Sequence, residues 1–394
     1  MSPGDLSFPK RVESIGPSPI VVLREMAGEM RAAGQAVIDL TIGEPDFDTP
    51  QFIVHAAEAA MEAGFTHYVS SRGIGELRQA IAQKLEGENG LHYDPDQEIV
   101  VTLGGKQALF STILATIEEG DEVLILDPAW VSYDPCVRLA GGIPIHVPLS
   151  ASDNFLITTE FLQPYLSKGT RMVILNSPNN PTGRVMTEDE IEAVASLAEE
   201  ADLLILSDEI YEKLVYDGRQ HLSIAALPSM RKRTVVVNGF SKAYAMTGWR
   251  LGYMAAPAAI VAAMIKVHQH SVTCAASFAQ KAGVVALNGP QDELQAMVAE
   301  FQARRDLICE GLDSIPGISC PRVEGALYAF PDISALGLPS SKLAERLLLE
   351  GGVATIPGIA FGASCDSHLR LCFATSRQEL ERALERIRSA VEKI

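Results

Sequence analysis

The chain has 394 residues and a mass of 42.4 kDa, enough for two or three domains at roughly 150 residues each. Hydrophobic residues make up 47% and charged residues 21% of the chain, which excludes disorder as its main state. The net charge is −18, and no cluster of Lys and Arg offsets it. Nucleic acid and anionic membranes are therefore excluded as main partners, because both require clustered cations.

The N-terminal residues MSPGDLSFPK show no basic region followed by an apolar run, so we expect no secretory signal and a cytoplasmic protein. The longest uncharged stretch, 251–265, is interrupted by Pro257 and is shorter than the about 20 residues of a membrane span. It predicts a buried segment. The six cysteines form no CxxC pair, and His268 and His270 point different ways on a helix. We therefore expect reduced thiols and no metal site.

The middle of the chain alternates short apolar runs with helical stretches. Thr187-x-x-Glu190 has the pattern of a capping box that opens one of these helices. The runs are β-branched or rich in Leu, as is typical of strands buried on both faces. They cover 99–103, 123–126, 172–175, 203–206 and 234–237. The alternation predicts an α/β domain with a mostly parallel sheet.

The C-terminal part has a different pattern. Ser376-x-x-Glu379 predicts the start of a long helix with one apolar face. That face would hold Leu380, Ala383, Leu384, Ile387, Val391 and Ile394. We expect a large domain over 48–285, a smaller α+β domain over 286–394, and an N-terminal segment, 1–47, that packs with the smaller domain.

Four predicted strands are followed by polar residues, and ligands of open α/β sheets gather at these strand ends. Gly104-Gly105-Lys106-Gln107 precedes a helix, so its backbone amides could bind a phosphate, or it could be an ordinary turn. The loop 176–183, NSPNNPTG, is stiffened by two prolines. It could aim its side-chain amides at a ligand oxygen, or it could be an elaborate turn.

The other two strand ends carry charged residues. Asp208 ends a buried strand and needs a cationic partner, either a protonated heterocyclic nitrogen or an arginine in a structural ion pair. Lys242 follows a strand at the same edge, where it could form a Schiff base with a carbonyl compound or simply extend into solvent. Arg250 could clamp an anion or form a salt bridge. Together the four strand ends fit pyridoxal phosphate, with its phosphate, ring nitrogen, phenolic oxygen and aldehyde.

Three motifs resemble the class I, fold-type I pyridoxal-phosphate aminotransferases, especially the bacterial aspartate aminotransferase subgroup. They are NSPNNPTG at 176–183, SDEIYEKLVYDG at 207–218 and NGFSKAYAMTGWRLGY at 238–253. The resemblance extends from 43–47, GEPDF, to 369–376, LRLCFATS. It implies an enzyme that moves an amino group between an L-amino acid and a 2-oxo acid.

The resemblance also implies roles for single residues. Lys242 would hold the cofactor as a Schiff base and move the proton at the substrate α-carbon. Asp208 would keep the pyridine nitrogen protonated, while Tyr211 and Asn180 would bind the phenolic oxygen. Trp130 would stack on the ring and contact the substrate.

Further implied roles concern the phosphate, the substrate and a second subunit. The phosphate would lie on the backbone of Gly105 and Lys106, with Ser241 and Arg250. Tyr68 would reach the phosphate of a neighbouring subunit, which implies a homodimer with shared sites. The substrate α-carboxylate would bind Arg370, assisted by Gly43 and Asn180. The cis prolines of the family would correspond to Pro128 and Pro181.

Substrate choice is less well defined by these motifs. Lys106 and Ser18 fit residues that accept a distal carboxylate in the aspartate subgroup, but Ile20 stands where threonine is common. Arg72 could add a carboxylate site or be a surface charge. We expect an aspartate- or glutamate-like donor. The alternatives are an aminotransferase for aromatic or apolar amino acids and a β-eliminating carbon–sulfur lyase. A non-enzymatic regulatory module lacks support, because the site is complete and no helix-turn-helix segment is present.

Overall fold

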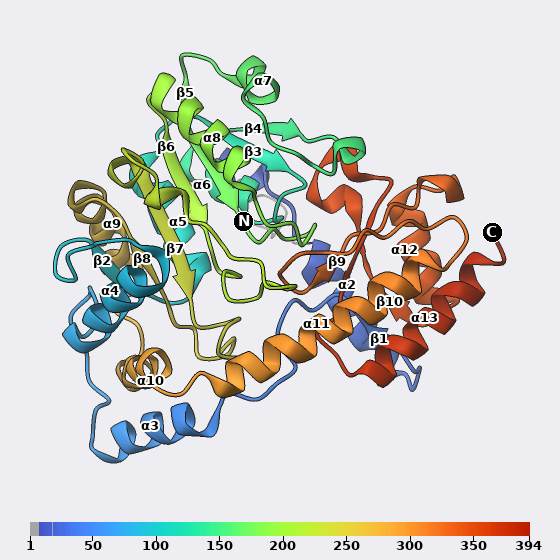
Figure 1. Cartoon of the computed structure of the whole chain (residues 1–394), viewed down its shortest axis with the longest axis horizontal. Coiled ribbons are helices and arrows are strands. Elements are labelled where there is room, and N and C mark those ends of the chain that lie inside the picture. Colours follow the sequence, from blue (N-terminus) through green and yellow to red (C-terminus); the bar gives the residue numbers. More distant parts are fainter. Residues whose placement is uncertain (1–7, 18) are drawn as a thin grey trace, which may run out of the picture.

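The computed structural model describes residues 8–17 and 19–394, and its centre is a seven-stranded sheet (Figure 1). All neighbouring strands are parallel except β8, which is antiparallel to both β2 and β7. The strand order is β2 (Ile99–Thr102), β8 (Gly252–Ala255), β7 (Thr234–Gly239), β6 (Leu204–Asp208), β5 (Thr170–Asn176), β3 (Glu122–Asp127) and β4 (Ile143–Pro148). The prediction of a mostly parallel α/β sheet is confirmed.

The sheet is covered by helices on both faces, which explains the continuous apolar runs of its strands. Along β3, Val123 and Ile125 pack into one core with α5 and α6, whereas Leu124 and Leu126 pack into another with α8. The covering helices are α4 (Gly75–Asn89), α5 (Gly105–Thr116), α6 (Tyr133–Ala140), α8 (Glu188–Glu200), α9 (Ala258–Ser271) and α10 (Ser277–Asn288). The short α7 (Thr159–Leu162) precedes β5, and α3 (Gln51–Glu62) lies against α10.

The capping box predicted at the start of α8 is present. The Thr187 hydroxyl accepts a hydrogen bond from the Glu190 amide, and the Glu190 carboxylate accepts one from the Thr187 amide. Two strands of the sheet were not among the predicted runs. β4 lies at the edge and has a single buried residue, Val147. The four residues of β8 lie inside the uncharged stretch 251–265, which also contains the start of α9.

The C-terminal elements form a second group, joined to the sheet by the long helix α11 (Asp292–Asp313), as Figure 1 shows. A small sheet has the order β11 (Ile356–Pro357), β12 (Leu369–Cys372) and β9 (Tyr328–Ala329), and the helices are α12 (Ser340–Leu349) and α13 (Arg377–Val391). The expected boundary between residues 285 and 286 falls inside α10. We propose that the division lies after this helix, in the turn at 289–291.

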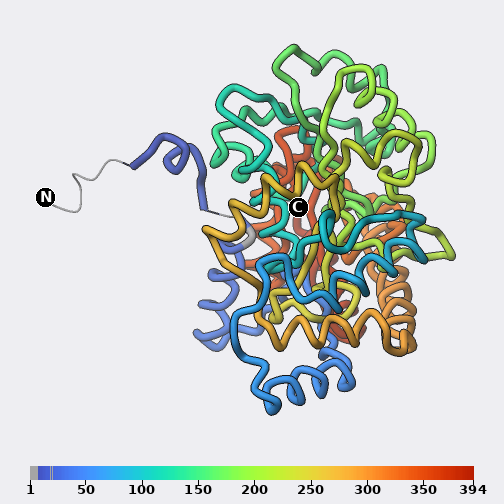
Figure 2. Tube along the Cα trace, turned by 90° about the vertical axis from the view of Figure 1, so that its left-hand side faces the viewer, coloured from blue at the N-terminus to red at the C-terminus, as the bar shows by residue number. Residues whose placement is uncertain are grey.

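The N-terminal strand β1 (Ile38–Asp39) pairs in parallel with β10 (Val353–Ala354). The helix α2 (Pro19–Ala32) precedes β1 and contacts β10 and β11. The short helix α1 (Lys10–Glu13) stands out from the body of the chain beside α6 (Figure 2). Across residues 8–17 and 19–394, no helix combines the length and the apolar character needed to cross a bilayer.

The helix α13 begins as predicted, because the Ser376 hydroxyl accepts a hydrogen bond from the Glu379 amide. Leu380, Ala383, Ile387 and Val391 are buried along one face of the helix. The expectation that Ile394 continues this face is wrong. The helix ends at Val391, and Ile394 beyond it is 46% exposed.

Candidate active site

A cavity of about 330 Å³ lies at the carboxyl ends of the central strands. It brings together eleven of the twelve predicted site residues, which are far apart in the sequence. These are Gly43, Gly105, Lys106, Trp130, Asn180, Asp208, Tyr211, Ser241, Lys242, Arg250 and Arg370. The twelfth, Tyr68, does not line this cavity, and its side chain is 86% exposed on the loop between α3 and α4.

Lys242 lines the cavity from the loop that connects β7 to β8. Its ammonium group donates a hydrogen bond to the carbonyl oxygen of Gly43 and lies 5.9 Å from the centre of the Tyr211 ring. Burial lowers the pKa of Lys242 to about 8. A larger fraction of this amine is therefore neutral near pH 8 than for an exposed lysine, as a nucleophile for a carbonyl carbon requires.

Asp208 ends β6 and is buried. Its Oδ2 accepts a hydrogen bond of 2.8 Å from the Tyr133 hydroxyl, and its Oδ1 accepts one of 3.3 Å from the Ile210 amide. Burial raises the pKa of Asp208 to about 6, although the hydrogen bond from Tyr133 acts in the opposite direction. Within residues 8–17 and 19–394 Asp208 forms no ion pair, so the structural pair with arginine is absent there. The carboxylate remains available for a protonated ring nitrogen.

The start of α5 provides a cradle for a phosphate. Gly104 caps the helix with a φ of +80°, and a Cβ atom there would lie 2.9 Å from a terminal nitrogen of Arg250. The helix then begins with the amides of Gly105 and Lys106, which favour an anion. Arg250 donates a hydrogen bond of 2.8 Å to the Thr247 carbonyl, and Ser241 lies nearby in the cavity wall. This donor set fits the phosphate of pyridoxal phosphate.

The indole of Trp130 forms one wall of the cavity. It follows β3, and its ring meets the Tyr133 ring edge to face at 5.4 Å. The ammonium group of Lys106 lies 4.7 Å from the centre of the Trp130 ring. Burial lowers the pKa of Lys106.

Arg370 is a buried cation on β12, only 1% exposed. Its guanidinium donates 3.2 Å to the side-chain oxygen of Asn180 and 2.6 Å to the Thr41 carbonyl, and it lies 4.5 Å from the centre of the Tyr328 ring. Its Nε is buried with no partner, and no described carboxylate pairs with it. A buried guanidinium without a counter-ion is costly, so the site suits a ligand carboxylate.

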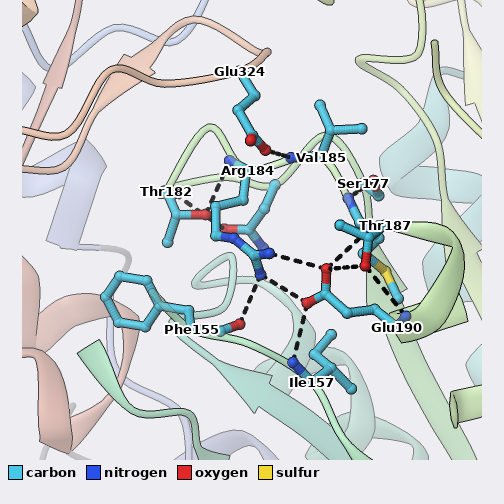
Figure 3. Close-up of polar contacts among 11 residues, drawn as sticks. Phe155, Ile157, Ser177, Thr182, Arg184, Val185, Thr187, Glu190 and Glu324 are labelled. Atoms are coloured by element: carbon cyan, nitrogen blue, oxygen red, sulfur yellow. Dashed lines mark hydrogen bonds and ion pairs between the residues drawn. The ribbon is translucent and has the colours of Figure 1, made fainter. Parts of the chain in front are cut away.

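The loop that carries Asn180 is anchored to the sheet and to α8. The Asn180 amide donates 2.8 Å to the Asn176 side chain, which in turn donates 3.0 Å to the Asp208 carbonyl. Beyond the loop, Arg184 forms a two-pronged pair with Glu190, at 2.8 and 2.9 Å (Figure 3). Asp127-Pro128 and Asn180-Pro181 are cis, as predicted, and Ser177-Pro178 is a third cis bond that was not predicted.

Sequence reasoning gave no site role to twelve of the residues that line the cavity, among them Tyr328, Tyr133 and Arg24. Tyr328 shares a hydrogen bond of 2.6 Å with the Tyr211 hydroxyl. Tyr133 follows Trp130 by three residues and bonds to Asp208. Arg24, on α2, lines the cavity from the N-terminal segment. A tyrosine so close to Trp130 was a signal that could have been used, whereas Tyr328 and Arg24 lie outside every motif.

The remaining residues considered for substrate choice are placed as follows. Arg72 donates 3.2 Å to the Gln97 carbonyl and does not line the cavity. Ser18 lies outside the described residues, and the side chain of Ile20 is also outside the description.

Comparison with known proteins shows which family combines this fold with this set of residues. The family model described as "Aminotransferase class I and II" matches residues 35–387. The chain belongs to this family. It is therefore a pyridoxal-phosphate-dependent aminotransferase of fold type I, related to the aspartate aminotransferases, and it exchanges an amino group between an amino acid and a 2-oxo acid.

Individual relatives of this aminotransferase are similar over nearly their whole length. It is 41% identical to an aspartate aminotransferase of Pyrococcus abyssi, over 97% of each chain. It is 40% identical to an aromatic-amino-acid aminotransferase of Thermococcus litoralis, again over 97% of each chain. The structure of Thermus thermophilus aspartate aminotransferase with maleate superposes with a TM-score of 0.92 at 41% identity, covering 98% of this chain and 100% of that one.

Proposed function

We propose that this aminotransferase acts on dicarboxylic substrates, with an aspartate- or glutamate-like amino donor. One observation carries the proposal. Besides Lys242, four cations line the cavity, and none of these four forms an ion pair with a described carboxylate. They are Arg24, Lys106, Arg250 and Arg370. A cofactor phosphate and a substrate α-carboxylate account for two of these cations, and a second carboxylate on the substrate would account for the others.

The proposed roles of the chain's own residues follow from their positions. Pyridoxal phosphate, when bound, supplies an electron sink that makes the α-proton of the substrate acidic. Lys242 holds the cofactor and then carries that proton as the general base. Asp208 keeps the ring nitrogen protonated, and Trp130 covers the ring. Tyr211 and Asn180 bind the phenolic oxygen.

The proposed phosphate and substrate contacts use the rest of the cavity. The amides of Gly105 and Lys106, with Ser241 and Arg250, bind the phosphate. Arg370 binds the α-carboxylate, because its planar guanidinium can bind a carboxylate with two parallel hydrogen bonds. Gly43 and Asn180 assist Arg370 in binding this carboxylate. The side chains of Lys106 and Arg24 attract the distal carboxylate.

The experiment is a single-turnover titration of the purified holoenzyme with one amino acid at a time, without an acceptor, followed by the absorption of the cofactor. Aspartate and glutamate are expected to bleach the initial band at the lowest concentrations, and the Lys242→Ala protein is expected to show no bleaching. Bleaching by phenylalanine or leucine but not by aspartate would reject the dicarboxylate proposal. Release of pyruvate and ammonia from a cysteine conjugate would instead indicate the lyase.

We also propose a homodimer in which Tyr68 completes the site of the neighbouring subunit. Two observations support it: Tyr68 is 86% exposed although it is a predicted phosphate contact, and the apolar Phe8 and Val12 near the N-terminus are 59% and 43% exposed. Such exposed apolar side chains are typical of an interface. The cytoplasmic location remains a prediction.

Mixing two inactive variants tests the shared site. A hybrid of Lys242→Ala and Tyr68→Ala subunits has one site with both residues intact if Tyr68 acts across the interface. Activity should therefore reappear when the two proteins are dissociated and reassembled together. If the mixture stays inactive although hybrid dimers form, Tyr68 does not act in the neighbouring site.

A further inference from the structure

One short segment, 127–134, supplies two side chains to the active site. It connects β3 to α6, and it carries Trp130, which forms a cavity wall, and Tyr133, which donates the hydrogen bond to Asp208. A carboxylate stands at each end of the segment, Asp127 at the end of β3 and Asp134 in the first turn of α6. The position of both aromatic side chains depends on how these two ends are held.

The side chain of His146, on the edge strand β4, contacts both ends. Its Nδ1 lies 3.0 and 2.9 Å from the two carboxylate oxygens of Asp127, and its Nε2 lies 3.0 Å from Oδ2 of Asp134. A neutral imidazole has one N–H group, whereas the protonated ring has two. Bridging two carboxylates therefore requires the protonated ring. Hydrogen bonds to Asp127 and Asp134 raise the pKa of His146 to about 9, which keeps the ring protonated at neutral pH.

The bridge is balanced in charge and tightly packed. Arg138 pairs with Asp134 through two hydrogen bonds, at 2.7 and 3.0 Å, so two cations face two carboxylates. Asp127 is buried, and a Cβ atom on Gly362 would lie 2.7 Å from its side chain. The Ala129 amide donates 2.8 Å to the Phe361 carbonyl. The start of the segment thus has little room to move, and the bridge extends this restraint to its other end.

We propose that His146 is a positioning residue of this aminotransferase, which holds Trp130 and Tyr133 in place by bridging Asp127 and Asp134. His146 does not line the cavity, so it acts only through the segment. The inference is independent of which amino acid is the donor. The proposed role predicts that loss of the bridge makes the indole of Trp130 more mobile and weakens the hydrogen bond from Tyr133 to Asp208.

The test variant is His146→Gln, whose amide can donate to one carboxylate but cannot bridge both. The chain has two tryptophans, so Trp130 is the only one in a Trp249→Phe background. In the cofactor-free protein, His146→Gln should raise the acrylamide quenching of Trp130. In the holoenzyme it should shift the pH titration of the cofactor absorption and lower kcat/KM by about 10- to 100-fold, since a misplacement of about 1 Å can cost about 100-fold.

Two further variants serve as controls. His92→Gln changes an exposed histidine whose side chain pairs with Glu86, and it should leave all three readouts unchanged. Asp134→Asn removes the charge from one end of the bridge and should move the readouts in the same direction as His146→Gln, which keeps the test open if His146→Gln does not fold. Arg138→Gln leaves the bridge to His146 in place and should have a smaller effect.

The outcomes separate this proposal from the proposed function. If His146→Gln only lowers the thermal midpoint and leaves the quenching and the absorption titration unchanged, His146 is merely structural and the proposal is overturned. If the quenching rises while aspartate fails as a donor, the positioning role stands and the substrate proposal fails.

Discussion

The hydroxyl of Tyr133 lies 2.8 Å from Oδ2 of Asp208 and donates a hydrogen bond to it. Both groups are buried, so this bond is made where water does not compete. It favours the charged form of the carboxylate that is proposed to face the cofactor nitrogen. A residue outside the recognised motifs therefore affects the protonation of Asp208.

Replacing Tyr133 with Phe should raise the pKa of Asp208 further, because the carboxylate loses a hydrogen bond that favours its charged form. A hydrogen bond to a charged group contributes about 1.5–3 kcal/mol, so we expect kcat to fall about 10- to 100-fold. The pH dependence of the cofactor absorption should shift in the same variant. An unchanged kcat and an unchanged titration would show that the bond does not act on the cofactor.

Capture of the cofactor by the apoenzyme should depend on the protonation of Lys242. The neutral amine is the nucleophile, and the pKa of Lys242 is lowered to about 8 by burial. The rate of cofactor binding should therefore rise with pH and level off above about pH 9, as the ammonium group loses its proton. Stopped-flow absorption at fixed ionic strength measures this rate. A midpoint near the pKa of a free lysine, about 10.4, would contradict the prediction.

Arg24 and Arg370 should affect different parts of the substrate. Arg24→Gln should lower kcat/KM for aspartate by about 3- to 10-fold and leave alanine unaffected, because only aspartate has a distal carboxylate. Arg370→Lys should lower kcat/KM for both, since lysine cannot form the two-pronged contact. Arg382→Gln is the matched control, because Arg382 is exposed on α13 and does not line the cavity. Equal losses for aspartate and alanine in Arg24→Gln would count against the distal-carboxylate role.

Removing one partner of the buried pair of Lys84 and Glu212 should lower the stability strongly. The two side chains are 6% and 7% exposed, and the pKa of Glu212 is lowered to about 2 even though burial alone would raise it. Lys84→Met leaves this carboxylate buried without its partner, which should cost about 3–5 kcal/mol. Thermal unfolding of the apoenzyme would show a clearly lower midpoint. Lys342→Met, which breaks an exposed pair with Glu345, should cost less than about 1 kcal/mol.

The strands that could be predicted are those in which burial on both faces produces a continuous apolar run. The apolar runs of β3, β5 and β6 are continuous because both faces of these strands are buried. The edge strand β4 has no such run, since only one of its six residues is buried and it contains two prolines. The strand β8 (GYMA) begins with a glycine and has no β-branched residue, so it lacks the signal that made β2, a strand of the same length, predictable.

Some residues of the site could likewise be predicted from local sequence patterns, and others could not. Asp208 and Lys242 lie at the carboxyl ends of predicted strands. Because parallel strands end at the same edge of a sheet, their proximity could be inferred from the sequence. The position of Arg370 was implied only by the family resemblance, because an arginine on a strand has no distinctive pattern. Arg24 and Tyr328 reach the cavity through tertiary packing of α2 and β9. No local sequence pattern specifies which residues such packing brings together.

The pairing of β1 with β10 has a consequence for the order of events during synthesis. Ile38 lies beside Val353, and the residues just after β1, including Gly43, form part of the cavity wall. All seven strands of the central sheet lie between residues 99 and 255, so this sheet can assemble while the ribosome is still adding the C-terminal helices. The N-terminal segment must wait for β10 to emerge. A nascent chain therefore gains its scaffold well before it gains a closed catalytic pocket.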